Sequence, residues 1–433
     1  MSTKSDWKKQ YAIPFLLVSL LFLMWGIANN MNDTLLAAFK RIMSISDLQS
    51  SLVQFAFYGA YFCFAIPAAL FIRKYSYKSG IILGLGLYAL GTLLFFPAGK
   101  ASSYIFFLFA IYVMAGGCAV LETTANPYIL SMGDSNSATR RLNIAQTFNP
   151  VGALGGILLS RHFILSSLNS AGAEERSMMS SEALKEIQHS EFNAVSEAYL
   201  VIGAILILLL IVIAITRMPL DKDTSKTDGF GSTFSRLRHN RSYCRGVIAQ
   251  FFYVGAQTCV WSFTIRYVME QTHSLEHSAS LVFLWSIIAF TAFRFIFTWL
   301  MKYFKPSYLL FISSMFAILA TCIVIFANGK IAIIALISIS AFMSLMFPTI
   351  YGISLERVNL SDAKVAASGL IMAILGGALL TPLQGWISDE TTISTSFVVT
   401  LGCFVIVSIF ALNATIENRN KEKDWCSISA QRL

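Results

Sequence analysis

Runs of largely apolar residues recur along the chain, and each run is long enough, at about 20 residues, to cross a lipid bilayer as a helix. The clearest runs occupy 11–32, 50–72, 80–98, 103–130, 198–216, 279–300, 307–326, 331–353 and 394–413. Three further segments are richer in Gly and amides: 142–162, 245–268 and 365–388. Only 13% of the residues are charged, against about 25% in a soluble protein, so a water-facing globule is excluded. We therefore predict an all-α integral membrane protein with twelve transmembrane helices, surrounded by the lipid bilayer.

The basic residues predict which ends of these helices face the cytoplasm, because Lys and Arg are concentrated in cytoplasmic loops. With the N-terminus inside, 23 of the 32 basic residues fall in inside segments and 8 in outside ones, which leaves Arg294 within a span. We therefore expect both termini to be cytoplasmic. The net charge of +9 then reports topology, and we expect no nucleic-acid partner. The outside loop at 163–197 is rich in Glu, and we expect it to be partly helical.

A charged linker at 217–244 divides the predicted spans into two sets of six. The sets echo each other, because Pro127 and Pro348 are 221 residues apart and a Gly-Gly pair in each half has the same spacing. This layout is that of a major facilitator, in which the substrate site lies between the halves near mid-membrane. The expected organisation is a six-helix bundle at 1–216, the linker at 217–244, a second six-helix bundle at 245–415 and a cytoplasmic tail at 416–433.

Two carboxylates are exceptions to the placement of acids in tails, loops or span ends. Glu122 lies within the fourth predicted span, and Asp33 lies in the outer part of the first if that helix continues towards Arg41. A charged side chain near the bilayer centre costs about 2.5–3.5 kcal/mol, so such residues are candidates for a function by default. Because burial disfavours the charged form of a carboxyl group, both residues are candidates to take up and release a proton. The competing interpretations are a solvated helix end for Asp33 and a structural partner of a buried Arg for Glu122.

Side-chain amides are unusually frequent near these acids and in other predicted spans. Asn29 and Asn30 precede Asp33 by about one helical turn, and Asn126 follows Glu122 by one turn on the same face. Each amide alone is explained as a hydrogen-bonding contact between helices, but together they predict the lining of a wet cavity. The remaining candidates are Gln146 and Asn149 in the fifth span, and a stripe of Gln250, Tyr253, Gln257 and Trp261 in the seventh.

This lining predicts a neutral ligand with many hydroxyl groups. Amides and carboxylates accept hydrogen bonds from hydroxyls, and amides also donate to them. Rings such as Trp25, Tyr61 and Trp261 offer apolar faces to the C–H side of a sugar, although packing or a place in the interface belt explains any single ring better. An anionic substrate needs several deep cations, and only Arg294 qualifies. A drug exporter would favour a more apolar cavity, so we expect a neutral monosaccharide to bind.

Cysteine and histidine predict neither a metal site nor a disulfide framework. The seven Cys are odd in number, lack CxxC spacing and mostly lie inside apolar runs, where they pack as small side chains. The five His form no HxxxH or HExxH pair. No loop carries a carboxylate cluster or a nucleophile–base pair. We therefore expect a protein that is not an enzyme and needs no cofactor.

Several blocks of the sequence resemble the fucose/proton symporter family of the major facilitator superfamily. They are NNMNDTLL (29–36), the run from QFAFYGAYF to IPAALFIRKYSYKSG (54–80), LETTANPY (121–128), RLNIAQTFN (141–149), AQFFYVGAQTCVWSFTIRYV (249–268) and SAFMSLMFPTI (340–350). The resemblance covers nearly all twelve spans, and it implies the twelve-helix fold and proton-driven uptake of a neutral hexose or deoxyhexose. It also implies the family's two membrane acids at Asp33 and Glu122, and cavity amides at Asn30, Gln146 and Asn149.

The function that we expect is a proton-coupled symporter that imports a neutral monosaccharide by alternating access, as a monomer in the bacterial inner membrane. L-Fucose or a related hexose or deoxyhexose is the expected sugar. Two alternatives stay open, namely a sodium-coupled symporter of the glucose/galactose type and a membrane sugar sensor that does not transport. A cation could use the same carboxylates as a proton. Retention of both Asp33 and Glu122 argues against the sensor, because a sensor needs no proton carrier.

Overall fold

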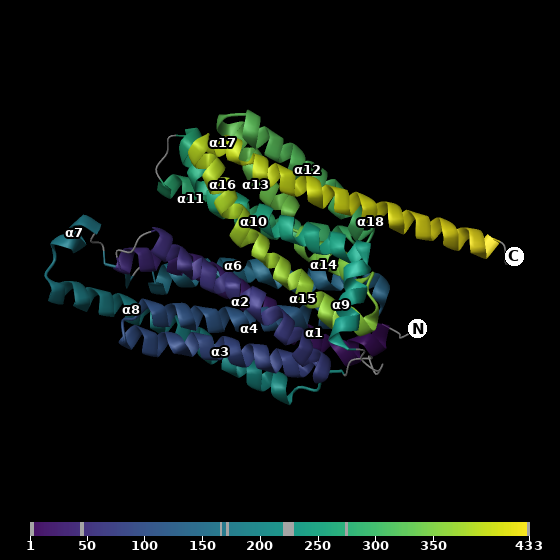
Figure 1. Cartoon of the computed structure of the whole chain (residues 1–433), viewed down its shortest axis with the longest axis horizontal. Coiled ribbons are helices and arrows are strands. Elements are labelled where there is room, and N and C mark those ends of the chain that lie inside the picture. The colour runs from purple at the N-terminus through teal and green to yellow at the C-terminus, as the bar shows by residue number, and fades with distance from the viewer. Residues whose placement is uncertain are drawn as a thin grey trace. The chain divides into compact units, whose positions relative to one another are not determined.

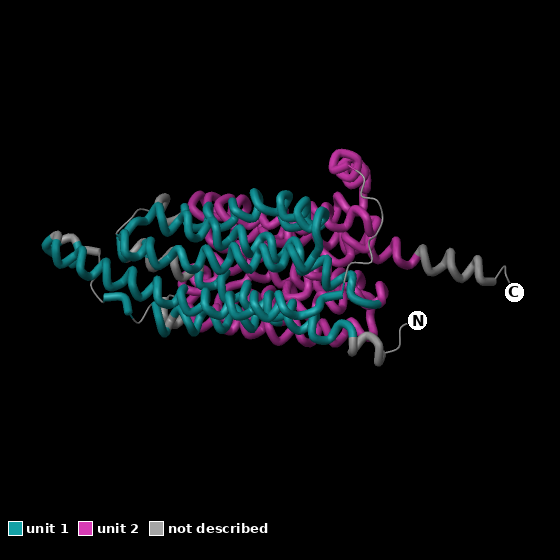
Figure 2. The backbone as a smooth tube through the Cα atoms, turned by 90° about the horizontal axis from the view of Figure 1, so that it is seen from below, with its two compact units in different colours: residues 1–133, 148–227, 367–372 teal, residues 134–147, 228–366, 373–433 magenta. Residues whose placement is uncertain are grey.

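The computed structural model describes residues 4–43, 47–164, 167–169, 173–219, 229–272 and 276–430. Within these ranges the regular structure is helical and contains no strand, which confirms the predicted all-α fold. The chain forms two compact units, drawn in teal and magenta in Figure 2. Unit 1 comprises residues 1–133, 148–227 and 367–372, and unit 2 comprises residues 134–147, 228–366 and 373–433.

Unit 1 contains the helices of the first six predicted spans, except for the start of the fifth. They are α1 (Lys4–Met43), α2 (Asp47–Lys74), α3 (Tyr77–Lys100), α4 (Tyr104–Ser131), α6 (Phe148–Leu159), the π-helical turn η2 (Ser160–Ile164), α7 (Ala173–Met178) and α8 (Ser181–Ile215). Its main packing pairs are α3 with α4, α3 with α8, α1 with α6 and α2 with α4. Several of these long helices run alongside one another in the lower half of Figure 1.

Unit 2 contains the helices of the last six predicted spans, together with α5 and the linker helix α9. They are η1 (Ser135–Ser137), α5 (Ala138–Gln146), α9 (Phe230–His239), α10 (Arg241–Thr272), α11 (Glu276–Leu300), α12 (Pro306–Phe326), α13 (Gly329–Met343), α14 (Met346–Leu355), η4 (Leu360–Asp362), η5 (Ala373–Leu375), α16 (Gly376–Glu390), α17 (Ile393–Ser396) and α18 (Val398–Ala430). One further helix, α15 (Ala363–Met372), begins in unit 2 and ends in the part of the chain assigned to unit 1.

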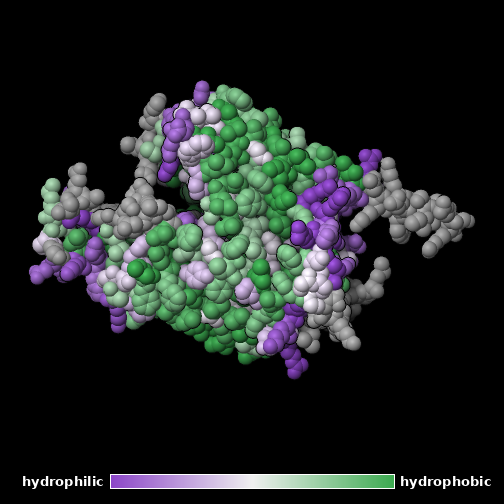
Figure 3. All heavy atoms as spheres, in the orientation of Figure 1, coloured by the Kyte–Doolittle hydropathy of each residue, from purple (hydrophilic) through white to green (hydrophobic). Residues whose placement is uncertain are grey.

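The lengths and surfaces of these helices suit a bilayer. Among the described residues, ten helices are long and apolar enough to cross a membrane. The two other predicted spans, 142–162 and 245–268, are helical as well, and their amides lower their hydropathy. Apolar residues cover much of the middle of the face that Figure 3 shows, and side chains such as Ile105 and Phe326 are 79% and 81% exposed. Apolar exposure on this scale is typical of a surface that contacts lipid.

Glycine permits two close helix crossings, one within each unit. In unit 1, a Cβ on Gly152 of α6 would lie 2.0 Å from the carbonyl oxygen of Leu23 on α1. In unit 2, a Cβ on Gly376 would lie 2.0 Å from the carbonyl oxygen of Phe251 on α10. Without a hydrophobic force between helices in lipid, close van der Waals packing through small residues holds them together. The first and fifth spans of each half therefore pack through glycine.

The two glycine pairs with the 221-residue spacing lie at these same crossings. A Cβ on Gly156 would lie 2.8 Å from a backbone oxygen of α1, and one on Gly377 would lie 2.9 Å from the side chain of Thr258 on α10. Gly155, in contrast, has no atom within 3.9 Å of its added Cβ. The repeated spacing thus identifies equivalent crossings in the two units, but Gly152 makes the closest contact in unit 1.

Two prolines interrupt helices that the hydropathy predicts to be continuous. Pro150 has no N–H to donate to the carbonyl of residue 146, and the fifth span breaks at Thr147 into α5 and α6. Pro348 likewise cannot donate to the carbonyl of Ser344, and the tenth span breaks at 344–345 into α13 and α14. Both breaks free backbone carbonyls inside the predicted bilayer, where water is absent.

The Glu-rich segment at 163–197 is largely helical, because α8 begins at Ser181 and continues into the sixth span. A buried ion pair holds the short helix α7 against it. Arg176 donates to the two carboxylate oxygens of Glu191 at 2.9 and 2.5 Å, and both side chains are 1% exposed. The amide of Asn169 donates to the same carboxylate at 2.8 Å. These hydrogen bonds from Arg176 to Glu191 raise the pKa of the guanidinium group, and they fix this end of unit 1.

Gly152→Ala and Gly155→Ala form a matched pair on one helix, and we expect them to differ in stability. The methyl group of Gly152→Ala meets the Leu23 carbonyl at 2.0 Å and forces α1 away from α6. Overpacking of this kind destabilises by about 1–3 kcal/mol. Gly155→Ala meets nothing closer than 3.9 Å and should be neutral. Thermal unfolding of the purified proteins in detergent measures the difference, and equal Tm values would contradict the close crossing.

Candidate functional site

Glu122 is a buried carboxyl group within α4. It is 3% exposed, and its Oε2 atom has no hydrogen-bond partner among the described residues. Residues 114–129 of the same helix are all buried, so this helix face offers no solvent to a charge. A carboxylate without partners is costly in such surroundings, whereas a protonated carboxyl group costs far less. The local chemistry therefore favours a residue that holds a proton.

Aromatic side chains from neighbouring helices of unit 1 lie beside this carboxyl group. Tyr61 on α2 is 1% exposed and lies within electrostatic reach of Glu122. Trp25 on α1 donates a hydrogen bond from its indole N–H to the Tyr61 hydroxyl. Tyr88 on α3 donates to the carbonyl of Met24, at 2.9 Å, and so holds α1 at the same level. The sequence singles out these two rings, Trp25 and Tyr61, only as possible sugar-stacking groups.

The predicted amides of unit 1 differ in burial. Asn126 is fully buried one turn after the carboxyl group, whereas Asn29, Asn30 and Asn149 are half-buried. Asn30 donates at 3.3 Å to a carbonyl one turn earlier in α1. Asn149 donates at 3.5 Å to a carbonyl of α1, a distance at the long limit for a hydrogen bond. The Asn149 amide is therefore held only weakly and can turn towards a ligand.

The stripe predicted along the seventh span lies on α10 in unit 2. Gln250 is fully buried, and neither atom of its amide has a hydrogen-bond partner among the described residues. Tyr253 donates at 3.1 Å to the last carbonyl of α13. Gln257 and Trp261 are half-buried, and the Trp261 indole donates to the hydroxyl of Ser340 at 3.4 Å. Because buried polar groups in proteins are normally satisfied, Gln250 is a strong candidate for a ligand-binding residue.

Arg294 on α11 is a buried cation at the same site of unit 2. It is 3% exposed, and its guanidinium group lies 5.0 Å from the ring centre of Phe290. The same ring stands edge-on to Trp261, with 5.2 Å between centroids. A cation–π contact compensates part of the desolvation of the guanidinium group. Phe290 therefore links the buried cation to the stripe on α10.

The carbonyl of Gln146 accepts a hydrogen bond from Arg294 Nη1 at 3.3 Å. This carbonyl is the acceptor that Pro150 leaves without its helical donor. The Nε atom of Arg294 has no partner among the described residues. From the sequence alone, Arg294 bears only on the exclusion of anionic substrates. Pro150, four residues after Gln146, is nevertheless a signal of a free backbone acceptor nearby.

Two hydrogen bonds tie α5 to α14 within unit 2. Thr139 donates to the carboxylate of Glu356 at 2.5 Å, and Asn143 donates to the hydroxyl of Thr349 at 3.3 Å. Gly352 permits the contact, because a Cβ there would lie 2.6 Å from the Thr139 hydroxyl. The bonded residues are 217 and 206 positions apart, so no local motif predicts them.

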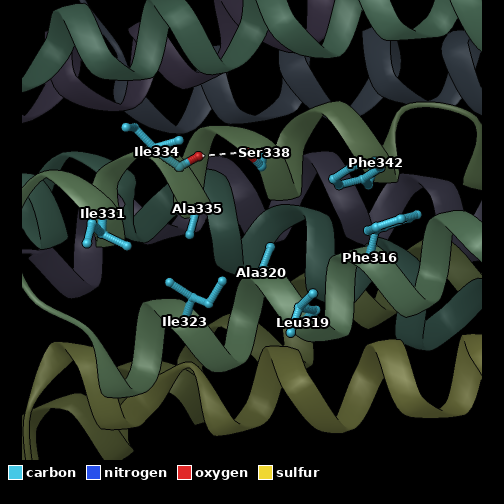
Figure 4. Close-up of a pocket in the computed structure, with 9 residues that line it drawn as sticks. All are labelled: Phe316, Leu319, Ala320, Ile323, Ile331, Ile334, Ala335, Ser338 and Phe342. Carbon is cyan, nitrogen blue, oxygen red and sulfur yellow. Dashed lines mark hydrogen bonds between the residues drawn. The ribbon is translucent and has the colours of Figure 1, made fainter.

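The pocket in Figure 4 lies away from these residues, between α12 and α13. It has a volume of about 270 Å³, and the only polar side chain among those lining it is Ser338, whose hydroxyl donates to the carbonyl of Ile334 at 2.8 Å. None of the predicted site residues lines it. Such apolar surroundings do not suit a polyol. Within the part of the chain that the structure describes, no group of three His, Cys, Asp or Glu could hold a metal ion.

The predicted residues thus fall into one group in each unit. The break at Thr147 separates two of them, because α5 belongs to unit 2 and α6 to unit 1. Asp33 lies in α1, but its side chain is outside the described residues, and its role stays a prediction. The unit 1 group is Asn29, Asn30, Glu122, Asn126 and Asn149, and the unit 2 group is Gln146, Gln250, Gln257 and Trp261.

Comparison with protein families and curated sequences gives consistent matches. A family model described as Major Facilitator Superfamily matches residues 15–374. An L-fucose-proton symporter of Haemophilus influenzae is 40% identical over 422 residues, which cover 94% of this chain and 97% of that protein. An L-fucose-proton symporter of Escherichia coli is 38% identical and covers 93% of each. A glucose/galactose transporter of Brucella abortus is 30% identical, over 95% of this chain and 96% of the relative.

Solved structures show the same relationship. The crystal structure of the transporter FucP in the outward conformation superimposes with a TM-score of 0.87 at 38% identity, over 93% of this chain and 99% of that one. The proton:xylose symporter XylE superimposes with a TM-score of 0.71 at 11% identity, over 92% of this chain and 94% of that chain. The second likeness shows a common fold and no more.

Proposed function

Since the chain belongs to the major facilitator superfamily, we propose that it is a proton-coupled symporter that imports a neutral monosaccharide by alternating access. L-Fucose is the first candidate, followed by related hexoses and deoxyhexoses. The relatives at 40% and 38% identity are L-fucose-proton symporters, whereas the relative at 30% is a glucose/galactose transporter.

The observation that carries the coupling is the unpartnered oxygen of Glu122. The buried Oε2 atom of a charged carboxylate at this position has no hydrogen-bond donor among the described residues, so the empty transporter favours the protonated form. A protonated carboxyl group donates one hydrogen bond and still accepts others, which suits a sugar hydroxyl. Sugar and proton then stabilise each other, and this mutual stabilisation is the thermodynamic basis of symport.

The amides supply the sugar contacts in this proposal. Asn149 is weakly held in unit 1, and Gln250 and Gln257 carry no hydrogen bond to a described residue in unit 2. A monosaccharide presents several hydroxyls, each of which donates and accepts, so it satisfies amides that apolar ligands would leave unpaired. The same requirement makes an apolar drug a poor substrate.

The hydrogen bonds between α5 and α14 support a cycle with two end states. They lie beside loops whose basic residues predict a cytoplasmic location. The structural relative FucP is in its outward conformation. We infer that Thr139–Glu356 and Asn143–Thr349 close the cytoplasmic side and must break before the sugar is released inward.

The remaining parts of the proposal concern placement and alternatives. We infer a functional monomer in the bacterial inner membrane with both termini in the cytoplasm, and no enzymatic activity. The alternative of a sodium-coupled symporter of the glucose/galactose type is not favoured, because the relatives at 40% and 38% identity are proton symporters. A sugar sensor is not favoured, because it has no use for a buried proton-binding residue.

Addition of the transported sugar should alkalinise the medium outside lightly buffered, de-energised vesicles, because each sugar carries a proton inward. A pH electrode records the change for L-fucose, glucose, galactose and mannose in turn, with sodium present or absent. Any sugar of this panel that is not taken up should produce no pH change and serves as the control. Uptake that follows a sodium gradient without any pH change would reassign the coupling ion.

Asp33→Asn should abolish gradient-driven accumulation but leave sugar exchange, which needs no net proton movement. Glu122→Gln provides the companion variant, because its neutral amide mimics the protonated acid. It should bind sugar with an affinity independent of pH and fail to accumulate it. The rates of accumulation and of exchange are both measured with radiolabelled sugar in the same vesicles. Normal accumulation by Asp33→Asn would show that this acid is only a solvated helix end.

Asn149→Leu and Gln257→Leu should each weaken sugar binding, because Leu leaves a sugar hydroxyl without a partner. An unsatisfied buried polar group costs about 1–3 kcal/mol, which corresponds to a roughly five- to 150-fold rise in Kd. The matched control is Asn413→Leu, a half-buried amide of α18 outside the proposed site. Calorimetry on purified proteins of equal Tm measures Kd. Unchanged affinity in both site variants would make these amides packing groups.

A further inference from the structure

The exposed surface of helix α9, in the linker, has an apolar part and a basic part. Thr233 and Leu237 are buried on one face, where they pack against unit 2. Phe230 and Phe234 lie one turn apart on the adjacent face, stack with 6.3 Å between ring centroids, and are 38% and 55% exposed. Two large rings exposed side by side on a short helix are unfavourable in water. We therefore expect an apolar surface outside the protein to cover these rings.

A strong ion pair fixes the orientation of α9 on unit 2. Arg236 donates to both carboxylate oxygens of Asp362 at 2.9 and 2.7 Å, and the Asp362 side chain is only 3% exposed. Just beyond the helix, Asn240 donates to the carbonyl of Arg357 at 2.8 Å. The bidentate geometry prevents rotation about the helix axis. The exposed phenyl rings consequently keep one direction relative to unit 2.

The direction of α9 within unit 2 suits a membrane surface. The helix stands upright in Figure 1, crosswise to the long helices of its unit, and is seen end-on at the margin of the unit in Figure 2. If the long helices cross the bilayer, α9 lies parallel to its plane. A short helix with an apolar face and a basic end is typical of proteins that lie in the membrane interface.

Basic side chains complete this surface at the C-terminal end of α9. Arg238 and Arg241 are exposed, and no ion pair or hydrogen bond of either side chain to a described residue is found. Arg236, by contrast, is already paired with Asp362. Arginine binds phosphate through two parallel N–H donors. Arg238 lies one helical turn after Phe234 on α9, and Arg241 is the first residue of α10. Exposed guanidinium groups close in sequence to exposed phenyl rings match the headgroup and acyl region of a phospholipid.

We propose that α9 is an interfacial helix that binds anionic phospholipid of the cytoplasmic leaflet. Phe230 and Phe234 enter the edge of the apolar layer, and Arg238 and Arg241 contact lipid phosphate. This inference rests on the proposed function, in which the linker lies on the cytoplasmic side of the membrane. Because only Asn240 separates α9 from α10, lipid binding fixes the start of the helix that carries Gln250.

Photocrosslinking in vesicles tests this placement. The residue at 234 is replaced by benzoylphenylalanine in the full chain, which is reconstituted in phosphatidylcholine with phosphatidylglycerol. The same replacement at Ser235, an exposed residue on a different face, is the matched control. A third protein carries it at Leu319, which is 57% exposed on the apolar surface of α12. Intact-protein mass spectrometry then measures the lipid adducts after irradiation.

We expect lipid adducts at 234 and 319 and few at 235. Phosphatidylglycerol should be enriched over phosphatidylcholine at 234, by about fivefold for each arginine near the surface. Arg238→Gln with Arg241→Gln should remove this enrichment, whereas Arg238→Lys with Arg241→Lys should retain most of it. The lysine protein also controls for folding.

Other outcomes separate this inference from the proposed function. Adducts at 319 without adducts at 234, in vesicles that take up sugar, would overturn the lipid site and leave the symporter intact. Adducts at 234 without preference for phosphatidylglycerol would overturn the anionic specificity. Lipid adducts at 234 in a protein that moves no sugar would support the interfacial helix and count against the symporter.

Discussion

A polar group inside a bilayer must find its hydrogen-bond partner within the protein, because lipid chains offer none. This requirement explains why the described spans are helical throughout, and it also explains what happens where the helices break. Near Pro348, at the end of α13, the carbonyl of Phe342 accepts a hydrogen bond from the Ser313 hydroxyl and that of Met343 accepts one from Tyr253. At Pro150 the carbonyl of Gln146 accepts from Arg294. At each break, side chains from other helices thus donate to backbone carbonyls, and these contacts shape unit 2.

The same requirement makes the exceptions informative. Glu122 and Gln250 are buried, and each keeps at least one polar atom without a partner among the described residues. In a low-dielectric interior such a group destabilises the protein unless something else satisfies it. Glu122 lies in unit 1 and Gln250 in unit 2, and they are two of several such residues.

Hydropathy and loop charge were enough to predict the number and order of the spans, because these depend on composition averaged over about 20 residues. Features that depend on a single contact were not predicted in this way. The equal spacing of the glycine pairs pointed to Gly155, yet the closest approach is at Gly152, one turn earlier on α6. Spacing identifies a helix crossing, but only the rotation of both helices decides which glycine meets a backbone.

Long-range pairs escaped for a different reason. The role of Arg294 depends on a carbonyl 148 residues away, and the contacts of α5 depend on partners still farther along the chain. The linker helix α9 lies in a segment that composition alone marks only as charged. Its order comes from Asp362, again a distant residue.

The exchange of short segments between the units has a consequence for biogenesis. Residues 134–147 belong to unit 2, although they are made and inserted long before the rest of that unit. Residues 367–372 belong to unit 1, although they leave the ribosome near the end of synthesis. Neither unit can reach its final packing as it is translated. Thr139 and Asn143 therefore have to wait for their partners until α14 and the residue after it have been made.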